Sequence, residues 1–112
     1  MPGRFYFDPD ATGTAIFMGR TEALLMDLAW DKKELTVKSA QFYLGPKQQL
    51  AYTTLLTTLS RLTQKGYLVK EKRDRSFTFI PARDRDSFID SRLETIAQSL
   101  KRSFSGRLDS LM

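Results

Sequence analysis

The sequence predicts an α+β, mainly α, fold in which three helices precede a β-hairpin and one long helix follows it. Three observations lead to this prediction: leucines at helical spacing in residues 52–66, two alternating segments around a charged turn in residues 67–81, and a long helical pattern in residues 84–104. This order of elements describes a winged helix-turn-helix with a C-terminal dimerisation helix. We therefore expect an N-terminal arm over residues 1–18, the winged helix over residues 19–83 and a dimerisation segment over residues 84–112.

The composition allows one small domain and excludes most enzymatic chemistry. The 112 residues include no cysteine and no histidine, which removes thiol nucleophiles, disulfides, imidazole bases and the usual zinc ligands. The carboxylates are scattered, so we expect no catalysis, no metal and no cofactor. No apolar run approaches the roughly 18 residues of a membrane span, and we expect a cytoplasmic protein without a signal peptide.

The N-terminal arm carries the aromatic cluster Phe5-Tyr6-Phe7. We expect these rings to cover an apolar edge of the domain or of a partner subunit. The alternative is an arm that contacts DNA directly through Arg4.

The first two helices are predicted as supports for the third. Residues 20–30 form the first helix on the spacing of Leu24 and Leu28, with Leu25 and Trp30 alongside. Thr21 is the candidate N-cap, and Glu22 lies near the positive end of the helix dipole. A second helix is expected after a short β-leaning segment. Its candidate cap is Thr36, its apolar positions are Val37, Ala40 and Leu44, and its end is at Gly45-Pro46.

The third helix, residues 52–66, has one apolar and one unusual polar face. Leu55, Leu59 and Leu62 recur at i, i+4 and i+7 and should face the core, and Lys65-Gly66 should end the helix. The opposite face carries short hydroxyls, an amide and one guanidinium, which suit close approach to base edges and phosphates. We interpret it as a DNA-recognition helix; the alternative is a core helix with a threonine-rich solvent face. The candidate contacts are Thr53, Thr54, Thr57, Ser60, Arg61 and Gln64.

A basic hairpin is expected directly after this helix. Leu68 should pair with inward-facing residues of the 76–81 strand, while Arg73 and Arg75 project from the tip. Between Arg61 and Arg83 there are seven basic and two acidic residues, a local excess equal to the +5 of the whole chain. Such a patch attracts a polyanion, although a merely solvated basic hairpin is the alternative. The candidate backbone contacts on the wing and its flanks are Lys38, Lys47, Lys72, Arg73 and Arg75.

The last helix is longer than the domain requires. A helix of about 20 residues spans about 30 Å, so its distal apolar stripe should pack against a second copy in a homodimer. The alternative is that the stripe packs back on the first helix of the same chain. Ser105-Gly106 should end the helix. The candidate dimerisation residues are Ile89, Leu93, Ile96, Leu100 and Phe104.

Five segments, residues 20–30, 34–37, 52–62, 65–68 and 77–81, together resemble the penicillinase-repressor family of winged-helix regulators, the BlaI/MecI/CopY group. The resemblance implies a dimeric repressor that occludes a promoter by binding a two-fold-symmetric operator in double-stranded DNA. It places the third helix in the major groove and the wing on the backbone. By the family pattern, the contacts are Thr53, Thr54, Thr57 and Arg61 on the helix and Lys72, Arg73 and Arg75 on the wing.

The chain also departs from this family. Copper-responsive members end in a cysteine motif, so copper sensing is disfavoured here. Members that control β-lactam resistance are cleaved in their dimerisation region, which implies a regulatory protease as a partner, but no cleavage site maps onto residues 84–112. Because a fold alone does not imply DNA binding, the alternative function is a protein-interaction module with an acidic partner.

Overall fold

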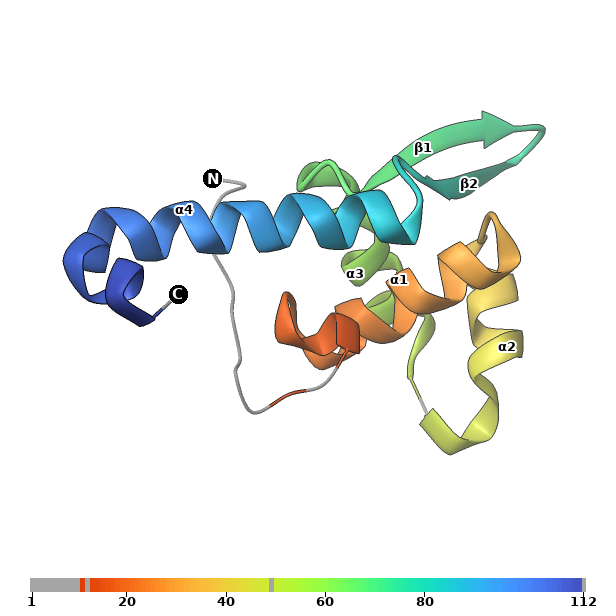
Figure 1. The fold of residues 1–112 in the computed structure, drawn as a ribbon. Coiled ribbons are helices and arrows are strands. Elements are labelled where there is room, and N and C mark those ends of the chain that lie inside the picture. Colours follow the sequence, from red (N-terminus) through yellow and green to blue (C-terminus); the bar gives the residue numbers. More distant parts are fainter. Residues whose placement is uncertain (1–10, 12, 49, 112) are drawn as a thin grey trace.

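The computed structural model describes residue 11, residues 13–48 and residues 50–111. The helices α1 to α3 pack together, the β-hairpin projects from one end of this domain, and α4 extends away from the other end (Figure 1). The described part measures 54 × 28 × 24 Å. This arrangement confirms the predicted fold class. The elements are η1, a short 3-10 helix (Gly13–Ile16), α1 (Arg20–Lys32), α2 (Val37–Gln48), α3 (Tyr52–Gln64), β1 (Leu68–Arg73), β2 (Ser76–Pro81) and α4 (Arg85–Leu111).

One hydrophobic core joins these elements. The leucines predicted to face inward from α3, Leu55, Leu59 and Leu62, are fully buried in it. Phe17 and Met18 are also buried there, although we expected both in the N-terminal arm. The end of that segment is therefore part of the domain core. The cluster Phe5-Tyr6-Phe7 and Arg4 lie outside the described residues, and so do the contacts expected of them.

Helix α1 differs from the prediction in its start and in its buried face. Thr21 is not the N-cap but lies in the first turn, because the helix begins at Arg20 after Gly19. The expected Leu24 and Leu28 are only half-buried. Because apolar residues follow one another in this segment, more than one face of the helix could be buried. Packing in the domain buries a different face from the one predicted. The core side chains are Leu25, Met26 and Ala29.

The capping predicted for α2 is confirmed by two hydrogen bonds. The Ser39 backbone N–H donates to Thr36 Oγ1 over 3.0 Å, and the Thr36 N–H donates to Ser39 Oγ over 2.8 Å. The helical backbone is interrupted at Gly45, as expected, where φ is 67° and ψ is −176°.

The end of α3 forms a Schellman motif. The Tyr67 N–H donates to the Leu62 carbonyl and the Gly66 N–H to the Thr63 carbonyl, each over 3.0 Å. Gly66 has a φ of 83°, a left-handed conformation that a side chain would strain. The predicted helix end is confirmed, and it turns the chain directly into the wing.

The wing is a tight antiparallel hairpin. Its register runs from Leu68 opposite Pro81 to Arg73 opposite Ser76, with a two-residue turn at the tip. At its base, Leu35 from the α1–α2 connection exchanges two backbone hydrogen bonds with Phe79, of 2.9 and 2.7 Å. The hairpin is thus attached to the domain by a third extended segment.

Helix α4 is anchored at its first turns. The Asp84 carboxylate accepts a hydrogen bond of 2.7 Å from the Ser87 N–H, which lowers the pKa of Asp84 below its ordinary value. Phe88 is 3% exposed and packs against the rings of Phe17, Trp30 and Tyr67. The start of the helix is therefore part of the domain.

The far end of α4 bends before it ends. Phe104 has non-helical angles, φ −140° and ψ 40°, one residue before the predicted break, and the helical backbone then resumes to Leu111. Within the described residues, none of the helices combines the length and apolar character needed to cross a bilayer.

A semi-buried ion pair connects α1 to the end of α3. The Lys65 ammonium lies 3.0 and 2.8 Å from the two carboxylate oxygens of Glu22. The Glu22 side chain is 9% exposed and that of Lys65 is 26% exposed. The pair fixes the end of α3 against α1.

Glu22→Gln should lower the free energy of unfolding by about 2–4 kcal/mol, because it leaves the Lys65 ammonium largely desolvated without its counter-charge. Thermal denaturation followed by circular dichroism measures this loss. The matched control is Asp31→Asn, which breaks the exposed Asp31–Lys32 pair at 3.5 Å and should cost less than about 1 kcal/mol. Equal shifts for the two variants would contradict a role for burial.

Candidate nucleic-acid interface

The outer face of α3 carries the side chains that were predicted from the sequence to contact DNA. Thr53, Thr54, Thr57, Arg61 and Gln64 are exposed, whereas Ser60 is half-buried. The neighbouring Thr58 is buried, and its hydroxyl donates to the Thr54 carbonyl over 2.8 Å. The helix therefore presents a continuous row of short polar groups, with Ser60 at its margin.

Two larger side chains on the same helix were not among the predicted contacts. Tyr52 is 46% exposed and Leu56 is 40% exposed. At four residues apart they form one row, and Leu56 lies about 90° around the helix from the buried leucines. Their helical phase indicates that both are exposed, but neither is a short hydrogen-bonding side chain of the kind on which the prediction was based.

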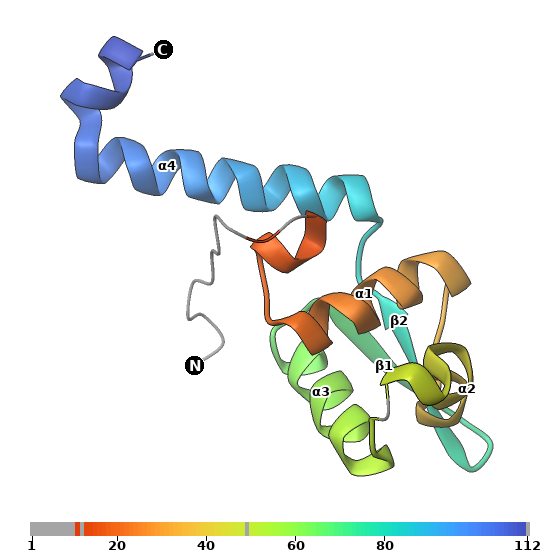
Figure 2. The ribbon, with the colours of Figure 1, turned by 90° about the horizontal axis from the view of Figure 1, so that it is seen from below.

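A groove of about 750 Å³ lies between the start of α2, the first turns of α3 and the wing tip. Figure 2 shows the start of α3 and the wing tip reaching toward the same side of the domain. Tyr52, Leu56 and Phe77 supply its apolar surface, while Lys38 and Arg75 supply cations from opposite walls. Asp74 also lines the groove at the tip.

The strand register separates the basic residues of the wing. Lys72 lies opposite Phe77 and so shares the groove side of the hairpin, whereas Arg73 lies opposite Ser76 on the other side. Lys72 and Arg75 are exposed and form no ion pair within the described part of the chain. Lys70 lies on the same side, with its ammonium 4.0 Å from the centre of the Phe77 ring, and Arg75 lines the groove from the tip.

Arg73 does not project from the loop as the sequence suggested. Its guanidinium donates to Glu71 Oε1 and to Glu34 Oε2, each over 2.6 Å. The hydrogen bonds with Glu71 and then Glu34 raise the pKa of Arg73 above its ordinary value. Arg73 therefore ties the wing to the α1–α2 connection, and the basic patch loses it and Lys65 to carboxylate partners.

The two flanking lysines differ in what the structure shows. Lys38 is exposed at the start of α2 beside the groove. The side chain of Lys47 lies outside the described residues, so its predicted contact stays a prediction.

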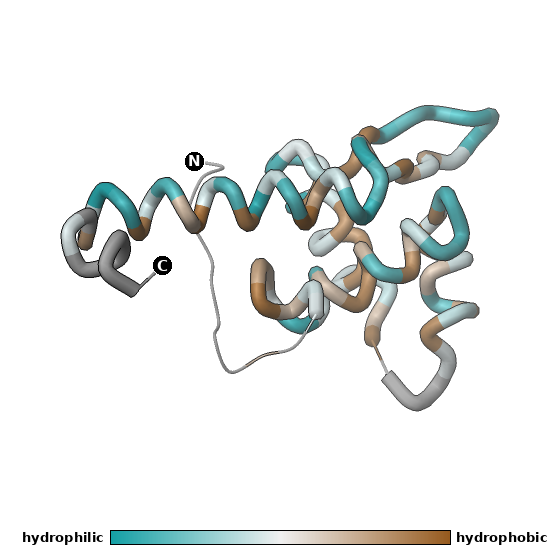
Figure 3. Tube along the Cα trace, in the orientation of Figure 1, coloured by the Kyte–Doolittle hydropathy of each residue, from teal (hydrophilic) through white to brown (hydrophobic). Residues whose placement is uncertain are grey.

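The apolar stripe of α4 divides between two environments. Ile89 and Ile96 pack against the core of the same chain. Leu93, Leu100 and Phe104 are 52%, 42% and 56% exposed. Figure 3 shows apolar residues recurring along one side of this helix beyond the domain. The alternative of packing within the chain thus accounts for Ile89 and Ile96 only.

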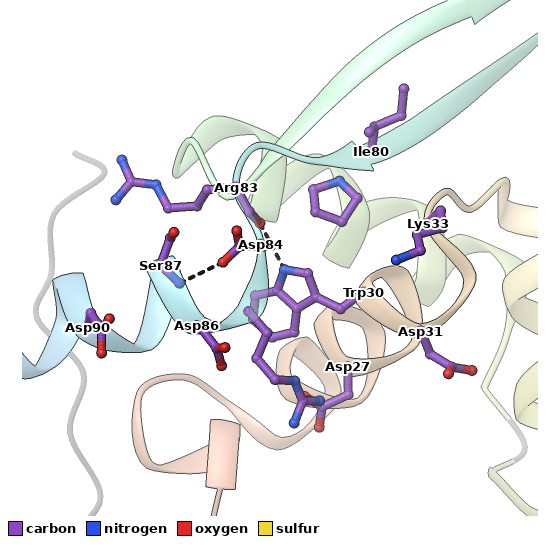
Figure 4. Close-up of a pocket in the computed structure, with 12 residues that line it drawn as sticks. Asp27, Trp30, Asp31, Lys33, Ile80, Arg83, Asp84, Asp86, Ser87 and Asp90 are labelled. Carbon is purple, nitrogen blue, oxygen red and sulfur yellow. Dashed lines mark hydrogen bonds and ion pairs between the residues drawn. The ribbon is translucent and has the colours of Figure 1, made fainter.

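A second hollow, of about 760 Å³, marks the junction of α1, β2 and α4 (Figure 4). The Trp30 indole N–H donates to the Arg83 carbonyl over 3.0 Å. Arg85 donates to Asp27 Oδ1 over 2.6 Å, and its guanidinium lies 5.3 Å from the Trp30 ring. These contacts hold α4 at a fixed angle to the domain.

Three comparisons with known proteins each found a match to this chain. A family model described as penicillinase repressor matches residues 18–112. The transcriptional regulator BlaI of Mycobacterium tuberculosis, in strains CDC 1551/Oshkosh and ATCC 25618/H37Rv, is 33% identical over 73 residues, which are 64% of this chain and 53% of BlaI. The chain thus spans about half the length of the curated relatives it matches. The solution structure of the DNA-binding domain of the repressor BlaI is similar with a TM-score of 0.55 and 25% identity, covering 61% of this chain and 83% of that one.

Proposed function

The chain belongs to the penicillinase repressor family, and from this premise we propose that it is a sequence-specific transcriptional repressor that binds a two-fold-symmetric DNA operator as a homodimer. The outer face of α3 enters the major groove, the wing lies on the backbone, and occupancy of the operator blocks a promoter. The observation that carries the proposal is the short polar face of α3 beside a groove with Lys38 and Arg75 on opposite walls.

The proposed contacts fall into two classes. Thr53, Thr54, Thr57 and Arg61 reach base edges and so determine which sequence is bound. Lys38, Lys72 and Arg75 meet phosphates, and so position the protein on any duplex. Arg73 contributes mainly by holding the wing, because its guanidinium already has two carboxylate partners.

Selection from a pool of random duplexes tests the function itself. The expected outcome is an enriched inverted repeat whose half-sites lie about one helical turn, or a multiple of it, apart. A protein-interaction module would enrich no sequence. Failure to enrich any duplex would therefore overturn the proposal, and it would leave the protein-interaction alternative.

Arg61→Ala should weaken binding to the selected duplex by about 1–3 kcal/mol per half-site and relax base preference. Arg75→Ala should weaken all duplexes alike and reduce the salt slope by about 1 per half-site. The difference follows from base-edge contact in one case and phosphate contact in the other. Fluorescence anisotropy on selected and scrambled duplexes at several salt concentrations measures both effects.

A variant that removes one positive charge elsewhere in the chain is the control for long-range electrostatic effects. Arg102 is an exposed arginine on α4, and Arg102→Ala should leave the preference for the selected duplex unchanged. If Arg61→Ala lost equal affinity for the selected and the scrambled duplex, its proposed role in reading bases would be wrong.

A further inference from the structure

Leu56 interrupts the polar surface of α3 with an exposed apolar side chain. It is 40% exposed, while Leu55 directly before it is fully buried. Exposed apolar area next to a binding surface gains free energy only when a partner removes it from water. Leu56 would therefore gain most from a partner group that is itself apolar.

The position of Leu56 restricts what that partner can be. On the helix it lies within about 60° of Thr53 and about 100° from Thr57, so it lies at the edge of the surface that carries the proposed base contacts. The adjoining groove is lined by two cations, Lys38 and Arg75, and one carboxylate, Asp74, and this net positive charge favours a polyanion over an apolar peptide. The occupant that fits both features is a DNA strand at the edge of the major groove.

DNA offers one aliphatic group on the base edges of its major groove, the C5-methyl of thymine. We propose that Leu56 contacts a thymine methyl group in each operator half-site and thereby adds an apolar term to base recognition. This inference rests on the proposed function. Tyr52, four residues earlier on the same row, lies on the groove side of this contact.

Replacing single thymines of the selected operator by deoxyuridine tests the contact, because this change removes one methyl group and keeps base pairing. A single replacement at either member of one symmetry-related pair of positions should cost wild-type protein about three- to five-fold in affinity, the value expected for one buried methyl group. Leu56→Ala should bind the thymine and deoxyuridine duplexes equally. Fluorescence anisotropy on matched duplexes gives these ratios.

The variant and its control are both expected to fold. Leu56 is exposed and alanine favours helix, so Leu56→Ala leaves no cavity and keeps helix propensity. Phe42→Ala removes an apolar side chain that is 80% exposed on α2 and does not line the groove. This control should keep the full dependence on thymine.

The outcomes separate this inference from the proposed function. If the selected operator binds equally well with and without each of its thymine methyl groups, the proposed contact is wrong but the repressor function stands. Thymine dependence that persists in Leu56→Ala assigns the methyl group to another residue and also overturns it. If Leu56 contacted a deoxyribose instead, the affinity would also be unchanged by deoxyuridine, and the thymine contact would be wrong. Failure to select any duplex would overturn the proposed function itself.

Discussion

Replacing Leu93 and Leu100 together by aspartate should convert the protein into a monomer and lower its operator affinity by at least about 100-fold. Both leucines are exposed on α4, Leu93 to 52% and Leu100 to 42%. A carboxylate in each position would have to be desolvated in an interface between two such helices. A monomer then binds one half-site without the gain that a tethered second site provides, which is typically 10² to 10⁴.

Sedimentation velocity and fluorescence anisotropy on the full operator measure the two parts of this prediction. Thr95→Asp combined with Gln98→Asp is the matched control, because it adds the same two charges on the opposite side of α4. The control should remain a dimer with near-normal affinity. An unchanged sedimentation coefficient for the double variant would refute the assignment of this stripe to the dimer interface.

Phe88→Ala should lower the free energy of unfolding by about 3–5 kcal/mol. Phe88 is 3% exposed, and its ring centre lies 5.0 Å from that of Tyr67, 5.3 Å from that of Trp30 and 6.2 Å from that of Phe17. Alanine would leave a cavity where the N-terminal segment, α1, the wing base and α4 meet. The loss therefore removes both core packing and the attachment of α4.

Thermal denaturation should show a fall in Tm on the order of 15 °C for Phe88→Ala in a domain of this size. Phe42→Ala serves as control, since its ring is 80% exposed and its loss should change stability by less than about 1 kcal/mol. If Phe88→Ala melted with the wild type, the start of α4 would not be a structural part of the domain.

Local signals were sufficient to predict α3 and its limits. Helical spacing places Leu55, Leu59 and Leu62 on a single face, and all three are buried. Gly66 supplies the left-handed residue that ends the helix. The buried face of α1 was not predictable in this way. Its consecutive apolar residues fit more than one face, and only the position of α3 and the wing decides which face is buried.

Pairs distant in sequence account for most of what the sequence did not predict at the candidate site. Arg73 pairs with Glu34, 39 residues away, and Lys65 with Glu22, 43 residues away. Neither pair leaves a local pattern, so both bases were counted as part of an open basic patch. The groove beside Leu56 likewise exists only once α2, α3 and the wing tip are placed together.

The two backbone hydrogen bonds between Leu35 and Phe79 have a consequence for the entropy of association. Ordering a free backbone costs about 1–2 kcal/mol per residue. A hairpin already held by its base has little conformational freedom left to lose when its tip meets a duplex. The proposed phosphate contacts of the wing should therefore retain most of their favourable free energy, and the encounter should proceed as the docking of two preformed surfaces.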